Sequence, residues 1–135
     1  MKELSSADIV DIIYTHIRTS ELAKEVPTLY KYKHFLNPSG EFIVVAPLVN
    51  VINNSQIANV NVNIYVPDQT PTLDRKEQRY PNDERLKFLS DLAIKTLKGY
   101  PSDKRYFFRV DSESITSEEN MSYSFVTLRV KLTNS

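Results

Sequence analysis

The most regular hydrophobic pattern in the chain lies between Gln56 and Val66, where apolar and polar side chains alternate without interruption. Side chains of a β-strand point to opposite faces in turn, so the pattern predicts a strand with one buried side and one wet side. The apolar series is Val60, Val62, Ile64 and Val66, and the other series is Asn59, Asn61, Asn63 and Tyr65. Such a strand needs a second layer over its apolar side. The two segments with helical periodicity, near residues 6–23 and 83–98, are the candidates.

Both helical segments carry start signals and an apolar stripe. Ser5 or Ser6 is the expected N-cap of the first helix, and Asn82 or Asp83 that of the second. Gly99 is the expected terminating residue of the second helix. The stripes are Ile9, Ile12, Ile13 and Ile17 in the first helix, and Leu86, Leu89, Ala93 and Leu97 in the second.

Four further segments have the character of strands. Residues 29–36 alternate and are followed by the turn sequence NPSG, which predicts a hairpin with the apolar run at 41–51. That run is expected to be buried on both sides, with Pro47 marking a bulge or an edge position. Two more strands are expected at 105–115 and 121–132, joined by a polar connection.

The segment at about 67–82 contains three prolines and mixed charge without periodicity. This composition predicts a long, semi-ordered loop or arm, and loops of this length in compact domains often carry function.

The element order predicts an α+β protein with two helices packed on one face of a mostly antiparallel sheet of about four to five strands. With 135 residues, 41% of them hydrophobic, the chain is expected to form a single domain, 1–135. Seventeen basic and seventeen acidic residues cancel, so no overall field attracts polyanions. There is no cysteine for disulfides, and two glycines are too few for a phosphate-cradling loop. The chain start lacks the apolar core of a signal peptide, and no segment approaches the roughly 20 apolar residues of a membrane helix, so a cytoplasmic site of synthesis and no membrane partner are expected.

Candidate chemistry is sparse. His16 is expected to be a semi-buried structural residue, whereas His34 lies either on a solvated hairpin arm or on an aromatic and basic face that could bind nucleic acid. Asp111 and Glu113 are two residues apart and are expected on the same strand face, near Glu118 and Glu119. Paired carboxylates can serve hydrolysis or bind a divalent cation, but no second ligand set accompanies them, which favours a solvated acidic rim. We therefore expect no catalytic residue, no metal and no cofactor.

Five segments in this order resemble the tail-terminator, or tail-completion, proteins of long-tailed bacteriophages and prophages. They are DIVDIIYTHI, EFIVVAPLV, NVNVNIYV, ERLKFLSDLAIKTL and the final strand pair ending SYSFVTLRVKL. Proteins of that family assemble as rings, usually hexameric, that stop tail-tube polymerisation and join the tail to the head, with an axial channel for DNA. The resemblance implies a structural virion protein, made in the cytoplasm of a bacterial host. Its partners would be further copies of itself, tail-tube proteins and head-connector proteins, and no enzymatic activity is implied.

This resemblance gives the loop and the acidic cluster expected roles. A ring needs contacts that close by rotation, so subunit contacts are predicted on exposed strand edges and on the loop, through Leu73, Arg75, Lys76, Arg79 and Tyr80. The residues predicted to face the channel are Asp111, Glu113, Glu118 and Glu119.

Two other classes of function remain open. The first is a small nucleic-acid-binding or protein-interaction module with aromatic and basic strands. Its residues would be Tyr30, Lys31, Tyr32 and Lys33 on one strand and Arg105, Tyr106, Phe107, Phe108 and Arg109 on another. The second is a small hydrolase, for which the sequence indicates no concave site with perturbed acids.

Overall fold

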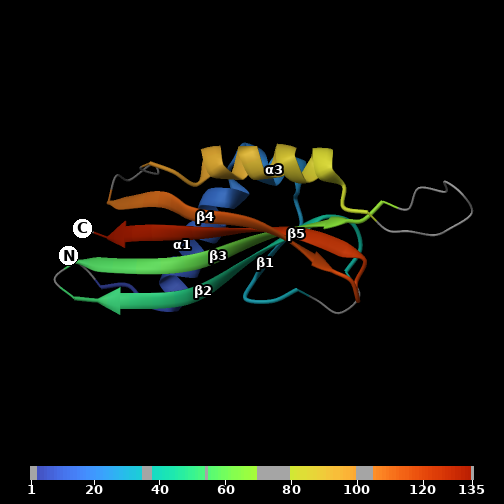
Figure 1. The fold of residues 1–135 in the computed structure, drawn as a ribbon. Helices are drawn as coiled ribbons and strands as arrows, with labels where there is room; N and C mark the ends of the chain where they lie inside the picture. Colours follow the sequence, from blue (N-terminus) through green and yellow to red (C-terminus); the bar gives the residue numbers. More distant parts are fainter. Residues whose placement is uncertain (1–2, 35–37, 54, 70–79, 100–104, 135) are drawn as a thin grey trace, which may run out of the picture.

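The computed structural model describes residues 3–34, 38–53, 55–69, 80–99 and 105–134. Within these ranges it contains three helices and one five-stranded sheet (Figure 1). The elements are α1 (Ser6–Arg18), α2 (Glu21–Glu25), β1 (Leu29–Lys31), β2 (Phe42–Ile52), β3 (Gln56–Pro67), α3 (Asp83–Thr96), β4 (Tyr106–Glu118) and β5 (Tyr123–Asn134). The strand order is β1-β2-β3-β5-β4, and every neighbouring pair is antiparallel except β1 with β2. The α+β class is therefore confirmed, but the sheet is mixed rather than wholly antiparallel.

β3 is the central strand of the sheet. Burial along β3 alternates residue by residue, as the sequence predicts. Its apolar side joins one core with side chains from α1, α3 and β5, because Val62 and Ile64 lie fully buried beneath the helices. The opposite side carries the asparagines, which are partly exposed.

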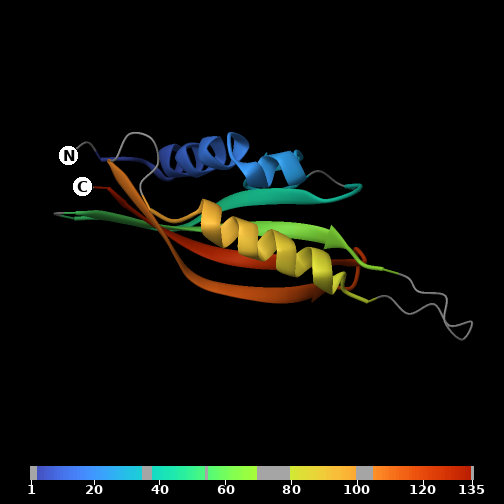
Figure 2. The same cartoon turned by 90° about the horizontal axis from the view of Figure 1, so that it is seen from above.

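The two long helices begin at the N-cap residues that the sequence predicts. Ser5 is the N-cap of α1, and a capping box links it to Asp8: the Asp8 amide donates to Ser5 Oγ at 3.1 Å and the Ser5 amide donates to Asp8 Oδ2 at 2.9 Å. Asn82 caps α3, because its Oδ1 accepts from the Arg85 amide at 3.3 Å. The first helical segment is split, since Ser20 is the N-cap of a separate short helix, α2. α1 packs on β2 and β3, and α3 packs beside it on β3 and β5, so both long helices cover the same face (Figures 1 and 2).

The predicted hairpin before β2 is wrong. β1 has only three residues and runs parallel to β2, with Leu29 opposite Ile43. Alternation predicts a strand but not the direction in which it pairs. Along β2, the Ile43 amide donates to Thr28 O at 2.9 Å, and Val45 O accepts from the amide of Tyr32 at 2.8 Å. The next residue in this series is Pro47, which has no N–H to donate, so the pairing with β1 ends there.

The two halves of β2 differ in burial. Phe42 to Val45 are buried, as the apolar run predicts, and the expected irregularity at Pro47 is a register shift between Pro47 and Val49. The second half of the strand contradicts the expectation of burial on both sides. Leu48, Val49, Val51 and Ile52 are 43–56% exposed.

A buried polar cluster around Gln56 holds one end of the sheet together. Gln56 is fully buried, and its amide group forms two hydrogen bonds with the backbone of Leu4: Oε1 accepts from the Leu4 amide at 2.9 Å and Nε2 donates to Leu4 O at 2.6 Å. Nε2 also donates to Asn50 Oδ1 at 2.7 Å, and Oε1 accepts from Asn134 Nδ2 at 3.0 Å. One side chain therefore joins the entry to α1 with β2, β3 and β5, near where both chain ends lie (Figure 1).

Arg85 at the start of α3 joins this helix to α2 and to the residue before β2. Its guanidinium forms a two-point contact with Glu41, from Nε at 2.8 Å and from Nη2 at 2.9 Å. It also donates to the Glu25 carboxylate and to the Glu25 carbonyl, both at 3.3 Å. The hydrogen bonds that Arg85 donates to Glu41 are the main cause of a raised pKa for Arg85.

Candidate functional site: the open face of the sheet

No helix within the described ranges covers the side of the sheet opposite α1 and α3, which we call the open face (Figure 1). Residues paired across antiparallel strands point to the same side, so the register gives its composition. Each row contains one residue from β2, β3, β5 and β4, in that order. At one end of the strands the row is Val51, Ile57, Thr133 and Phe107. The next three rows are Val49, Asn59, Lys131 and Arg109; Ala46, Asn61, Arg129 and Ser112; and Val44, Asn63, Thr127 and Ser114. The row at the other end is Phe42, Tyr65, Phe125 and Thr116. The face thus has an apolar end, a polar and basic middle, and an aromatic end.

The aromatic end is a closed packing unit. Tyr65 is stacked between Phe42, with ring centroids 4.5 Å apart, and Phe125, at 4.7 Å. His34 packs on Phe42 at 5.1 Å, and the Tyr123 hydroxyl donates to Gly40 O at 2.8 Å. Burial, followed by the nearby charge of Glu118, raises the pKa of Tyr65. The residues before β2 are therefore fixed to the open face by ring packing, and His34 belongs to this packing rather than to a solvated arm.

The middle of the open face carries three cations, Arg109, Arg129 and Lys131, which we call the cationic band. Arg109 and Lys131 stand directly opposite each other on β4 and β5, and Arg129 lies two residues from Lys131 on the same face. The Arg109 Nε donates to Asp111 Oδ1 at 2.8 Å. Beside the band, Oδ1 of Asn61 is buried and has no hydrogen-bond partner among the described residues, and the same is true of Asn63.

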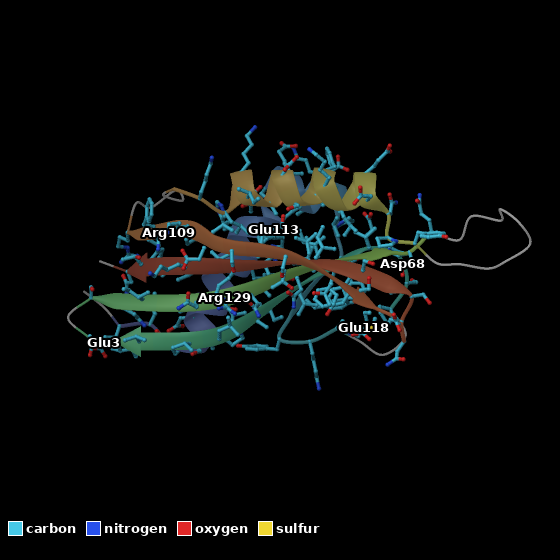
Figure 3. All side chains as sticks on the ribbon, viewed as in Figure 1. Glu3, Asp68, Arg109, Glu113, Glu118 and Arg129 are labelled. Atoms are coloured by element: carbon cyan, nitrogen blue, oxygen red, sulfur yellow. The ribbon has the colours of Figure 1, made fainter. Side chains whose placement is uncertain are left out.

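The four acidic residues predicted to face the channel do not form one cluster. A register shift between Val110 and Ser112 separates Asp111, which bonds to Arg109, from Glu113, which accepts from Ser90 Oγ of α3 at 2.9 Å. The expectation that these two share a strand face is therefore wrong, because Asp111 is itself the extra residue of the bulge and has no partner in the register with β5. Glu118 lies at the aromatic end, far along the strand from Arg109, and Glu119 lies in the turn before β5 (Figure 3).

The second half of β2 carries an exposed apolar surface made by Leu48, Val49, Val51 and Ile52, which we call the β2 end. Val49 and Val51 belong to the apolar end of the open face, whereas Ile52 is paired with the buried Gln56 and points to the other side of the sheet. Because β1 pairs only with Ile43, Val44 and Val45, the outer edge of this part of β2 has no neighbouring strand among the described residues. Large apolar side chains grouped on a monomer surface commonly mark a protein contact.

The predicted arm is described only at its ends. Leu73, Arg75, Lys76 and Arg79 lie outside the described residues. Tyr80 is 47% exposed and forms an isolated antiparallel pair with Gln69, with both backbone hydrogen bonds at 2.8 Å. The two described ends of the predicted arm, Gln69 and Tyr80, are therefore paired with each other.

The two segments proposed for nucleic-acid binding do not form one surface. The strand with Lys31 and the strand with Arg109 are the two outermost strands of the sheet, at opposite edges. Lys31 bonds to Asp11, and this contact is the main cause of its raised pKa. Phe108 is buried in the core. Any nucleic acid bound by both segments would therefore have to reach opposite edges of the sheet, and binding by either segment stays a prediction.

The remaining histidine, His16, contacts α3 and β4. His16 Nε2 lies 2.8 Å from Thr96 O, and its ring meets the edge of Phe108 at 5.1 Å, which confirms a structural role. No group of three or more possible metal ligands occurs in the described ranges. None of the described helices is both long and apolar enough to cross a membrane.

Sequence reasoning missed both the cationic band and the β2 end. A signal for the band was present, because Arg129 and Lys131 alternate with buried Leu128 and Val130. Their place beside the asparagines depends on β5 pairing with β3, which the alternation does not reveal. Comparison of the sequence with protein-family models and with curated proteins gives no match.

Proposed function

We propose that this chain is a structural virion protein of the tail-terminator class, which assembles into a closed ring, caps the tail tube and joins it to the head. The exposed β2 end is the observation that carries the ring, because four large apolar side chains within five residues favour burial against a partner. The order of helices and strands supports the choice of class through the resemblance described above.

A ring requires contact between two different surfaces of the same chain. The β2 end lies on one side of the sheet, and β4 forms the opposite outer edge. Along this edge, Phe108 forms an isolated antiparallel pair with Gly99. We propose that the β2 end of one copy packs near the β4 edge of the next copy, which joins subunits head to tail.

In this account the arm between Gln69 and Tyr80 supplies a second subunit contact, through Leu73, Arg75, Lys76, Arg79 and Tyr80. The ring contacts tail-tube and head-connector proteins, DNA passes through its channel, and no cofactor or catalysis is involved. The protein would be made in the cytoplasm of the bacterial host and reside in the virion.

The arm can be shortened without disturbing its base. Gln69 and Tyr80 exchange both backbone hydrogen bonds, so replacing residues 70–79 by Asn-Gly creates a two-residue hairpin loop that fits their pairing. Ser124 Oγ also donates to Asp68 Oδ1 at 2.8 Å, which holds the preceding residue. We expect this variant to keep the thermal midpoint of the native chain but to lose the ring in light scattering.

The control keeps the length of the arm and replaces residues 70–79 by Gly and Ser, which removes side-chain contacts alone. Loss of the ring in both variants assigns the contact to the arm side chains. A ring of unchanged mass in the shortened variant would contradict the arm contact.

A further inference from the structure

We propose that the cationic band on the open face contacts the phosphate backbone of double-stranded DNA through Arg109, Arg129 and Lys131. This inference rests on the proposed function only for the choice of duplex DNA as the occupant. The positive charge that would attract an anion belongs to the sheet itself.

The band concentrates positive charge in a way that costs stability. Arg109 and Lys131 are directly opposite each other, and like charges at such positions repel. Arg129 stands two residues from Lys131 on β5, about 7 Å along the strand. In the described part of the chain, neither Arg129 nor Lys131 has an ion-pair partner, and Asp111 bonds only to Arg109. An anion lying over the band would relieve this repulsion.

The side chains around the band suit phosphate oxygens. Asn59 shares a row with Lys131 and Arg109, and Asn61 shares a row with Arg129 and Ser112. Amide and hydroxyl groups of this kind commonly bond to phosphates beside arginine and lysine. The other acidic residues of β4 lie elsewhere, because Glu113 bonds to α3 and Glu118 lies at the aromatic end. The donors of the band are therefore not opposed by these two carboxylates, although the buried side-chain oxygens of Asn61 and Asn63 are acceptors.

The geometry favours contact with the backbone over reading of bases. No described helix projects from the open face to enter a groove, so the contacts would be independent of sequence. Asp111 neutralises part of the charge, and the chain as a whole is neutral. Both features keep the contact weak, which suits DNA that must move past the protein, since a strongly basic wall would hold it.

The test is fluorescence anisotropy with a labelled 20-base-pair duplex of arbitrary sequence, titrated at several salt concentrations. We expect Arg129→Ala with Lys131→Ala to weaken binding at low salt and to reduce the slope of log affinity against log salt to about a third of the native value, because about 0.9 of slope is lost with each phosphate contact. Asp111→Asn releases Arg109, so this variant should bind more tightly, with a steeper slope.

The matched control is Lys24→Ala with Lys87→Ala, which removes the same charge from exposed helix positions away from the open face. Equal loss in this control would show a general charge effect and overturn the assignment. No binding of the native chain at low salt, or tighter binding of a single strand of the same sequence, would also overturn it. Mass measurements on the same samples separate the two proposals. A monomer that binds DNA through the band would contradict only the proposed ring. A ring that does not bind duplex DNA would contradict only the proposed DNA contact of the band.

Discussion

Val49→Asp combined with Val51→Asp is expected to convert the assembled ring into monomers. Both side chains are exposed in the isolated subunit, so the folded protomer loses little packing when they are replaced. In the ring, the same positions would be buried against a neighbouring copy, where each unpaired carboxylate costs several kcal/mol. Because each 1.4 kcal/mol weakens association about tenfold, a cost of about 3 kcal/mol would weaken each subunit contact by about a hundredfold.

Phe88→Asp is the control for this experiment. Phe88 is 45% exposed on α3, similar in exposure to the β2 end but on a different element. Light scattering gives the mass of each variant, and a thermal melt shows whether the protomer stays folded. A ring that survives in the β2 variant, or that is lost equally with Phe88→Asp, would contradict the contact assigned to the β2 end.

Gln56→Leu is expected to lower the free energy of unfolding by about 3–5 kcal/mol. The substitution introduces an apolar side chain of similar size and removes the hydrogen bonds of Gln56 with the Leu4 N–H, Asn50 Oδ1 and Asn134 Nδ2, whereas Leu4 O still accepts from Asn50 Nδ2 at 3.0 Å. Each buried polar group that loses its hydrogen bond costs about 1–3 kcal/mol, and water that reaches part of the cluster offsets some of the sum. Urea denaturation monitored by circular dichroism measures the difference.

Gln69→Leu serves as the comparison, because Gln69 is exposed and only its backbone forms the pair with Tyr80. A change within about 0.5 kcal/mol is expected there. If Gln56→Leu proved equally mild, the Gln56 cluster would not be what holds the chain entry to the sheet.

The sequence predicted the elements of the fold better than their pairing. The alternation of β3 and the isoleucine stripe of α1 are local patterns, and both mark the faces that are buried. The length of β1 depends on which N–H groups of β2 are available, so the absence of an N–H at Pro47 limits a strand that lies well before it in the sequence. The bulge at Asp111 likewise reverses the side to which Glu113 points, and a simple count of two residues cannot reveal it.

The candidate site was less predictable for the same reason. The cationic band consists of Arg109 of β4 and of Arg129 and Lys131 of β5. Taken alone, the sequence of each strand predicts only a strand and does not indicate that these three cations are neighbours. The apolar run of β2 gives no sign that its first half is buried and its second half is exposed, because the first half packs into two clusters whose other residues are distant in sequence. Site residues that depend on register therefore required the structure.

Absolute mass in solution tests the central claim most directly. We would measure light scattering on the purified native chain over a concentration series, at low and at high salt. The account predicts a defined particle of about six subunits of 15.6 kDa each, which persists at high salt because the contact at the β2 end is apolar. A strict monomer at every concentration, or a mass that keeps growing as concentration rises, would contradict a closed ring.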